Sequence, residues 1–225
     1  MDLQIREKEI FETLKKLRSL DFVVIGGYSV NTYTLPRFSI DCDIVVKNEK
    51  ELEKVEEILI SLGYYKSKNR GDVSYNGSFK RYEKEIEMGF AVSLDILIKE
   101  VLDRQTSAVF PADWIFDNSA IKTLRGKTII EELKIRIINL DALFVMKMIS
   151  CRSTDIRDIF LLVSNIKNKE WVKEEINKRY NFNDRLEKVM REINSKQFKD
   201  GLQGVFGLVD DKMFERNKKM IEDLK

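Results

Sequence analysis

Histidine is absent from this sequence, and cysteine occurs only twice among its 225 residues. Without histidine, the chain cannot by itself form a Ser-His-Asp or Cys-His triad, an HExxH zinc site or an iron site with two histidine ligands. Two cysteines are too few for a zinc site with four thiolates. Ionic chemistry in this protein must therefore use Asp, Glu, Lys or Arg, with Ser, Thr and Tyr as hydroxyl groups.

Long apolar runs are also absent, since no stretch approaches the ~18 residues that a membrane-spanning helix requires. The sequence begins MDLQIREKEI, which is charged from its second residue and unlike a secretory signal. We therefore expect a cytoplasmic protein that does not contact membranes. In that compartment Cys42 and Cys151 are expected to be reduced and buried, and one disulfide between them is the alternative.

A surplus of charge of one sign is missing as well. The chain has 40 Lys and Arg against 38 Asp and Glu, which gives a net charge of +2. Charge alone therefore neither indicates nor excludes nucleic-acid binding. Hydrophobic residues make up 43% of the chain and charged residues 35%, a composition typical of a globular protein long enough to bury a core.

Hydrophobic periodicity divides the chain into a mixed part and a helical part. Up to about residue 138, helix and strand patterns alternate, and Gly71-Asp72 and Asn76-Gly77 are the expected hairpin tips. The expected helices span roughly 3–19, 28–35 and 51–62, and the expected strands 22–25, 39–46, 79–86, 91–98, 127–130 and 133–139.

From about residue 140 the pattern is helical only. The expected helices are 141–151, 154–166, 169–179, 183–193 and 209–224, with Gly201, Gly204 and Gly207 interrupting the chain before the last. We therefore predict an α+β fold, in which a mixed sheet with flanking helices in residues 1–138 precedes an all-helical domain in residues 139–225.

Two aspartates share one face of a predicted strand, SIDCDIVV at 39–46. Because alternate side chains of a strand point to opposite faces, Cys42 faces one side while Asp41 and Asp43 face the other. Their Cα atoms are expected roughly 7 Å apart, a range at which two carboxylates repel unless a cation lies between them. For this motif alone, a solvated edge strand with two exposed aspartates is the simpler explanation.

The segment AVSLDILI at 91–98 repeats this design, with Ser93 and Asp95 opposite an apolar face. Three carboxylates on neighbouring strands would form an oxygen-rich site suited to Mg²⁺, which keeps coordination positions for water and substrate phosphates. The three aspartates together therefore indicate a metal site.

The segment IGGYS predicts an anion site beside these carboxylates. It places Gly26 and Gly27 directly after a strand and at the start of a helix, where backbone N–H groups and the helix dipole can hold phosphate. Ser29 would add a hydroxyl group.

A second polar cluster begins the helical part, in DALFVMKMISCRSTDIRDIFLL. Lys147 is the only charge between Leu143 and Cys151, and Asp155 and Asp158 share a helix face three residues apart. Alternatively, Lys147 reaches solvent along its apolar stem and Asp155 interacts with the helix dipole.

These motifs together resemble the minimal nucleotidyltransferases of the DNA polymerase β superfamily, specifically the branch with AbiEii-type toxins of type IV toxin–antitoxin systems. That branch has a glycine turn, R-x-S-x-D-h-D (h apolar), a third carboxylate, and K-x-x-A-x-R-x-x-D-x-x-D. The matching residues, within about 22–165, are Gly26, Gly27, Arg37, Ser39, Asp41, Asp43, Lys147, Arg152, Asp155 and Asp158. Ser150 stands where the family usually has alanine, and Gly-Gly replaces the Gly-Ser of many relatives.

The resemblance implies a catalytic domain in residues 1–138, a helical C-terminal domain in residues 139–225, and a role for each site residue. Two Mg²⁺ ions, with Mn²⁺ as an alternative, would be held by the three aspartates, and Asp95 would also deprotonate the attacking hydroxyl. Lys147 and Arg37 would neutralise phosphate charge, with a structural partner of the aspartates as the alternative role of Arg37, and Asp158 would orient Lys147 or the acceptor. The implied metal ligands are Asp41, Asp43 and Asp95. The residues implied to hold the β- and γ-phosphates are Gly26, Gly27 and Ser29.

The implied reaction moves a nucleoside monophosphate from NTP to an acceptor hydroxyl of an RNA end such as tRNA, of a protein side chain or of a small molecule. An antitoxin would be a further partner. The alternatives are a non-catalytic nucleotide-binding scaffold and a helical half that mainly binds a partner protein. Residues 139–225 carry 18 Lys and Arg against 15 Asp and Glu, so they offer no basic track for RNA, and Trp171, Tyr180 and Phe182 are interpreted as helix core.

Overall fold

The computed structural model of the protein describes residues 2–67, 79–87, 89–207 and 209–225. The expected hairpin tips at Gly71-Asp72 and Asn76-Gly77 lie outside these residues. The chain divides into two compact units. Unit 1 comprises Met1–Thr32, Phe38–Val101 and Phe110–Ile138, and unit 2 comprises Tyr33–Arg37, Leu102–Val109 and Asn139–Lys225.

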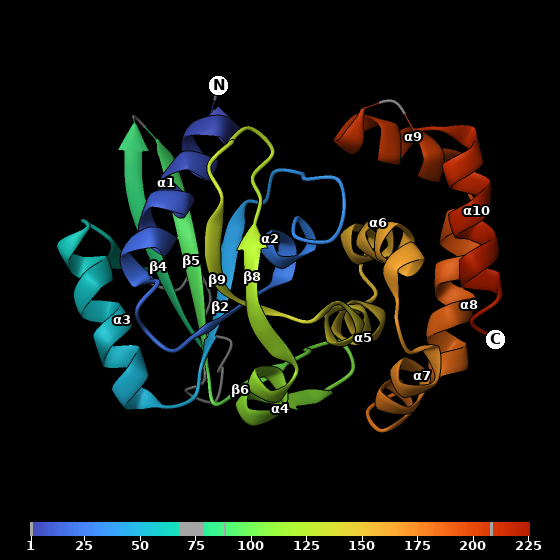
Figure 1. Cartoon of the computed structure of the whole chain (residues 1–225), viewed down its shortest axis with the longest axis horizontal. Helices are drawn as coiled ribbons and strands as arrows, with labels where there is room; N and C mark the ends of the chain where they lie inside the picture. Colours follow the sequence, from blue (N-terminus) through green and yellow to red (C-terminus); the bar gives the residue numbers. More distant parts are fainter. Residues whose placement is uncertain (1, 68–78, 88, 208) are drawn as a thin grey trace. The chain divides into compact units, whose positions relative to one another are not determined.

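Unit 1 is built on a seven-stranded mixed sheet with the strand order β3-β4-β5-β2-β1-β9-β8 (Figure 1). The pairs β2–β5 and β1–β9 are parallel, and the other neighbours are antiparallel. The strands are β1 (Val23–Ile25), β2 (Asp41–Val46), β3 (Tyr65–Lys66), β4 (Phe79–Glu87), β5 (Phe90–Ile98), β8 (Ser119–Leu124) and β9 (Leu133–Ile138).

Four helices belong to unit 1: α1 (Asp2–Leu17), α2 (Gly26–Val30), α3 (Glu49–Ser61) and α4 (Ala112–Asp117). The first and third pack against each other and against the sheet (Figure 1). Ile10, Leu14 and Leu17 recur at helical spacing on α1 and are fully buried, together with Cys42 and Leu94 from the facing strands. This apolar layer fixes which face of β2 and β5 is turned away from the core.

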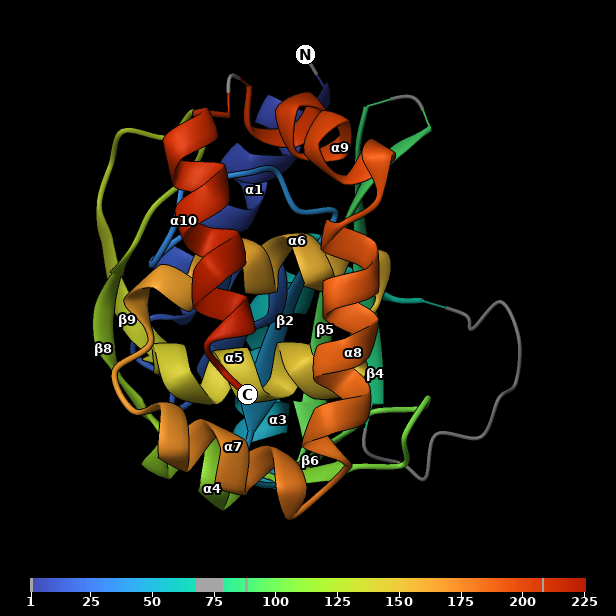
Figure 2. The same ribbon diagram turned by 90° about the vertical axis from the view of Figure 1, so that its right-hand side faces the viewer.

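Unit 2 is helical, as predicted (Figure 2). Its helices are α5 (Leu140–Ser150), α6 (Ser153–Leu162), the 3-10 turn η1 (Val163–Asn165), α7 (Lys169–Asn177), α8 (Phe182–Ile193), α9 (Lys196–Phe206) and α10 (Asp211–Glu222). Helices α8 and α10 lie side by side, and rings of Phe160, Phe198 and Phe214 contact one another between α6, α9 and α10. The predicted α+β architecture with a helical C-terminal half is confirmed.

The predicted states of the two cysteines and of one aromatic side chain are confirmed. Cys42 and Cys151 are both buried free thiols. Phe182 is 1% exposed, in agreement with its interpretation as helix core, whereas Trp171 and Tyr180 are half-buried. Among the described residues, no helix is both long enough and apolar enough to cross a membrane.

The strand predicted at residues 127–130 is wrong. These residues form a loop before β9, and the strand that pairs with β9 is β8. The cause lies in Glu7, a buried residue of α1, whose carboxylate accepts hydrogen bonds from the backbone N–H groups of Lys127 (2.6 Å) and Thr128 (2.8 Å). Because a carboxylate binds these donors, they are not available to a strand ladder.

The helix break predicted at Gly201 and Gly204 is also wrong, because α9 runs through both residues and ends before Gly207, where φ is +85°. A glycine in a helix costs about 1 kcal/mol relative to alanine. Burial of Phe198 and Leu202 on the same helix offsets this cost, since packing of an apolar side chain contributes about 1.5–3 kcal/mol. The short strands β6 (Glu100–Leu102) and β7 (Val109–Pro111) and helix α4 were not predicted.

Two tyrosines in the core of unit 1 differ in their hydrogen bonding. The Tyr28 hydroxyl is buried without a hydrogen-bond partner among the described residues, whereas the Tyr64 hydroxyl is 2.9 Å from that of Thr13. Burial raises the pKa of Tyr28 above its usual range. The two residues therefore allow the cost of an unpaired buried hydroxyl to be compared within one core.

We expect Tyr28→Phe to leave the free energy of unfolding unchanged or to raise it, because the substitution removes a desolvated hydroxyl that has no partner. Tyr64→Phe should lower it by about 1 kcal/mol, because Thr13 loses its partner. Urea unfolding of both variants measures the difference. Equal losses in the two variants would contradict this expectation.

Candidate functional site

The pairing of β2 with β5 brings the predicted acidic residues together. The two strands are parallel, with Asp41 opposite Ser93 and Asp43 opposite Asp95. Since side chains alternate along a strand, these four polar residues occupy the face that is turned away from the apolar core. The Ser93 hydroxyl donates a hydrogen bond to Asp41 Oδ1.

An arginine that the sequence analysis missed joins two of these carboxylates. Arg81 lies on β4 directly opposite Asp95, and its Nε and one terminal nitrogen donate to the two Asp95 oxygens at 2.7 and 2.8 Å. The same terminal nitrogen is 3.2 Å from Asp41 Oδ1. The position of Arg81 within the predicted strand FKRYEKEI was the available signal, but the sequence did not reveal the register of β4 against β5.

The two carboxylates differ in exposure. The Asp95 side chain is 10% exposed and that of Asp41 is 36% exposed. Burial raises the pKa of the Asp95 carboxyl, although the Arg81 guanidinium acts in the opposite direction. Bonding to Asp95 in turn raises the pKa of Arg81, so the guanidinium stays charged.

The glycine turn is positioned against the third carboxylate. Gly26 has a φ of +64°, a conformation that favours glycine. A Cβ added at Gly26 would lie 2.0 Å from Asp43 Oδ2, so a side chain there would collide with the carboxylate. The backbone at Gly26 therefore approaches Asp43 closely.

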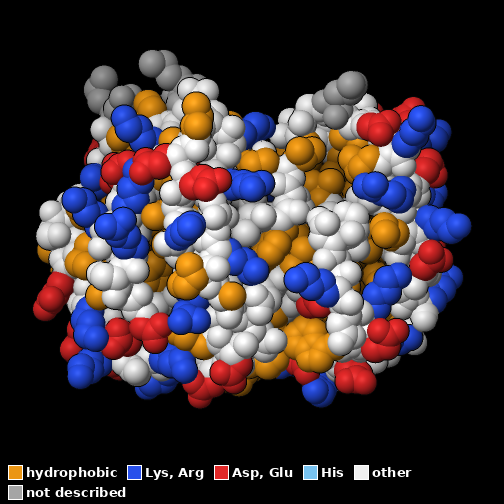
Figure 3. Space-filling view, in the orientation of Figure 1, with side chains coloured by type: hydrophobic (Ala, Val, Ile, Leu, Met, Phe, Trp, Pro, Cys, Tyr) orange, Lys and Arg blue, Asp and Glu red, His pale blue; other side chains and the backbone are white. Residues whose placement is uncertain are grey.

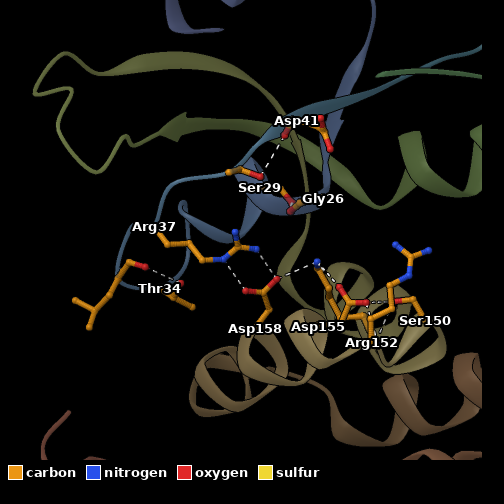
Figure 4. A network of polar contacts seen from close by, with 12 residues as sticks. Gly26, Ser29, Thr34, Arg37, Asp41, Ser150, Arg152, Asp155 and Asp158 are labelled. Carbon is orange, nitrogen blue, oxygen red and sulfur yellow. Dashed lines mark hydrogen bonds and ion pairs between the residues drawn. The ribbon is translucent and has the colours of Figure 1, made fainter. Parts of the chain in front are cut away.

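The remaining residues predicted to bind phosphate belong to the short helix α2. The Ser29 hydroxyl is buried and donates a 2.7 Å hydrogen bond to the carbonyl of Gly26 (Figure 4). Gly27 is buried in the same helix, which has only five residues. The phosphate-binding roles of these residues stay predictions, because the bond that Ser29 makes here is internal to the turn.

The donor set is suited to Mg²⁺ in its chemistry, but a chelating arrangement is not formed. Within the residues that the structure describes, no group of three or more acidic, cysteine or histidine side chains is close enough to hold a metal ion. Asp43 lies against Gly26, and the Arg81 guanidinium holds Asp95 and Asp41. A cation of the chain itself thus stands between Asp95 and Asp41, and the metal ion predicted from the sequence stays a prediction.

A second polar cluster lies within unit 2 (Figure 4). Lys147 on α5 is 2.7 Å from Asp155 Oδ1 and 2.9 Å from Asp158 Oδ2, both on α6. Arg37 binds the two Asp158 oxygens at 2.9 and 2.8 Å. The Lys147 side chain is only 12% exposed, so the alternative in which it reaches solvent is wrong.

Local structure holds this cluster in place. Helix α5 is followed by Cys151, which has a left-handed conformation, and the backbone N–H of Arg152, just before α6, donates to Asp155 Oδ2 at 3.2 Å. The Ser150 hydroxyl donates to Asp155 Oδ2 at 2.7 Å. Ser150 therefore adds a hydrogen bond to the carboxylate that pairs with Lys147.

The charges of this cluster compensate one another. Burial alone would raise the pKa of Asp158, but Lys147 and Arg37 outweigh it, and the pKa lies below its ordinary value. Burial would lower the pKa of Lys147, but Asp158 and Asp155 raise it. Lys147 and Asp158 are therefore both charged near neutral pH, and each stabilises the charge of the other.

We expect Asp158→Asn to lower the free energy of unfolding by about 3 kcal/mol or more, because it removes the fully buried carboxylate that Lys147 and Arg37 share. Since the folded pKa of Asp158 is lowered, this stabilisation is present above about pH 4 and is lost as the pH falls through the folded pKa. Urea unfolding between pH 3 and 7 would measure both effects.

The matched control is Lys178→Met, which breaks an ion pair between Glu175 and a lysine that is 63% exposed. This change should cost less than about 1 kcal/mol. A similar loss in both variants, or a loss at Asp158 that does not change with pH, would contradict the expectation.

The sequence and the fold of this chain can both be compared with those of known proteins. The sequence matches no protein-family model and no curated protein at a significant level. The structure is similar to JHP933 from Helicobacter pylori, with a TM-score of 0.51 and 17% identity over 99% of this chain and 91% of that one.

Two further solved structures are similar in outline. A candidate nucleotidyltransferase from H. pylori has a TM-score of 0.49 and 16% identity, over 98% of this chain and 93% of that one. The lincosamide antibiotic adenylyltransferase LnuA with lincomycin bound has a TM-score of 0.48 and 22% identity, over 71% of this chain and 98% of that one. Because the identities are low, the similarity to JHP933 indicates a shared fold and nothing further.

Proposed function

We propose that this protein is a nucleotidyltransferase that moves a nucleoside monophosphate from NTP to an acceptor hydroxyl. The observation that carries the proposal is the β2–β5 register, which places three aspartates on one polar face of the sheet. Such a face is costly to maintain without a cation, because the carboxylates repel one another. The motifs that resemble the polymerase β superfamily are consistent with this function.

In the proposed reaction, the acceptor hydroxyl attacks the α-phosphate in line with the departing pyrophosphate. Asp41, Asp43 and Asp95 would hold Mg²⁺, or Mn²⁺ as the alternative. The metal, when bound, would neutralise charge on the triphosphate and lower the pKa of the attacking hydroxyl. The reaction needs positioning and charge compensation more than covalent catalysis.

The chain's own residues would have separate tasks. Asp95 is the carboxylate suited to accept the proton of the attacking hydroxyl, because burial raises its pKa and a base with a raised pKa accepts a proton more readily. Gly26, Gly27 and Ser29 are proposed to contact the β- and γ-phosphates. Gly26 also keeps the space that the Asp43 carboxylate occupies.

The polar cluster of Arg37, Lys147, Asp155 and Asp158 in unit 2 would supply positive charge, and its carboxylates would fix where that charge lies. Lys147 and Arg37 are proposed to neutralise phosphate charge, with Asp158 as the residue that orients both side chains. Because each cation is already bonded to a carboxylate, both are held in place before substrate binds. This arrangement reduces the entropy that would be lost on ordering two long side chains.

The acceptor class stays a proposal, as does a toxin-like role with an antitoxin partner. An RNA end such as that of tRNA and a protein side chain are both compatible with the residues present. Figure 3 shows Lys and Arg side chains interspersed with Asp and Glu over the visible face. Such a mixed surface is less typical of proteins that bind RNA mainly through its phosphates.

One observation favours the alternative function, a non-catalytic nucleotide-binding scaffold. Arg81 already compensates the charge of Asp95 and Asp41, so a metal ion is not needed to explain how these carboxylates coexist. The two functions differ in turnover, because a scaffold would bind NTP without transferring any part of it.

We expect the protein to transfer label from at least one α-³²P NTP, in the presence of Mg²⁺, to total RNA or to lysate protein. Asp41→Asn and Asp43→Asn should each reduce transfer by at least about a hundredfold, since each removes a proposed metal ligand. Asp113→Asn is the matched control and should keep full activity, because Asp113 is 81% exposed and pairs only with Lys47 in the contacts observed.

Full transfer by either proposed ligand variant would contradict the mechanism. NTP binding without label on RNA, on protein or on a panel of small hydroxyl compounds would support the scaffold instead.

A further inference from the structure

The position of Arg81 has a consequence for metal binding. Its guanidinium makes two charge-assisted hydrogen bonds with Asp95, at 2.7 and 2.8 Å, and approaches Asp41 at 3.2 Å. Paired hydrogen bonds of this kind are among the strongest that side chains form. Both Asp95 oxygens are therefore engaged by a cation from the chain itself.

A divalent ion and this arginine cannot both use Asp95 in the same way. A metal ligand must direct an oxygen lone pair at the ion, and a guanidinium beside the ion would repel it. The described residues contain no cluster of three acidic ligands, which is consistent with the arginine holding these carboxylates in a different arrangement. Metal binding at Asp95 therefore competes with the Arg81–Asp95 bonds.

The surroundings of Arg81 allow such a movement. Its side chain is 33% exposed, so the guanidinium can turn toward solvent without becoming a buried, unpaired charge. Its neighbours on β4, Lys80 and Tyr82, point to the other face, where both bind Glu56. The movement therefore leaves the strand and its core contacts in place.

We propose that Arg81 is a displaceable internal counter-ion, which occupies the place of a divalent cation between Asp95 and Asp41 and competes with it. The proposal rests on the proposed function, since it takes these aspartates as metal ligands. Arg81 is a positioning residue in this scheme: it keeps the carboxylates together while no metal is bound, and it lowers their affinity for the free ion. Once displaced, the guanidinium is free to bind a phosphate of the substrate, whose oxygens match its geometry.

The test is Mn²⁺ binding to the full chain, followed by the electron paramagnetic resonance signal of the free ion. Arg81→Met should bind Mn²⁺ at least about tenfold more tightly than the wild type, because the competing charge-assisted bonds are removed. Arg81→Lys keeps the charge but cannot make the paired contact, so it should also bind more tightly, by a smaller factor. This second variant serves if Arg81→Met folds poorly.

Two controls identify the site. Lys80→Met removes the same charge from the neighbouring position on the opposite face and should leave Mn²⁺ affinity unchanged. Adding Asp95→Asn to Arg81→Met should abolish the gain. A gain in Lys80→Met equal to that in Arg81→Met, or a gain that survives the loss of Asp95, would overturn the proposal.

The outcomes separate this proposal from the proposed function. If wild type and both Arg81 variants bind Mn²⁺ equally, Arg81 does not compete and the counter-ion proposal is wrong, while the metal site stands. If none of the three binds Mn²⁺, the aspartates are not metal ligands and both proposals are wrong.

Discussion

The parallel pairing of β2 with β5 is the constraint on which the rest of unit 1 depends. A shift of one residue would turn Cys42 and Leu94 out of the core and bring aspartates into it, at a cost that no local rearrangement could offset. The packing of α1 and α3 against the apolar face thus determines the position of the carboxylates on the other face. The hydrophobic core thus fixes where the carboxylates lie, and Arg81 holds Asp95 and Asp41 together at that position.

Charge compensation is the common feature of both polar clusters. In unit 1, Arg81 binds two aspartates that face partly to solvent, and in unit 2, Lys147 and Arg37 bind Asp158, which is fully buried. The difference in burial separates their roles. The Arg81 guanidinium, which is 33% exposed, can move to solvent, whereas breaking the contacts of Asp158 leaves an uncompensated charge in a low-dielectric environment.

Much of this could be read from the sequence, because it depends on local periodicity. The alternation in SIDCDIVV and AVSLDILI placed Asp41, Asp43 and Asp95 on strands, and helical spacing located the helices of unit 2. Arg81 was missed because its role depends on the register of β4, which is a non-local property. The errors at residues 127–130 and in α9 have the same origin: Glu7, distant in sequence, binds the backbone of the first, and packing overrides glycine propensity in the second.

The assignment of Tyr33–Arg37 and Leu102–Val109 to unit 2 has a consequence for how this chain can be dissected. Both segments precede residue 138 in the sequence, yet Arg37 binds Asp158, and Asp103 lies 3.8 Å from Arg152. A fragment that begins at residue 139 would keep Asp158 buried without one of its two cations. During synthesis, Tyr33–Arg37 and Leu102–Val109 emerge first, so they cannot complete their contacts in unit 2 until the helices from residue 139 onward have been made.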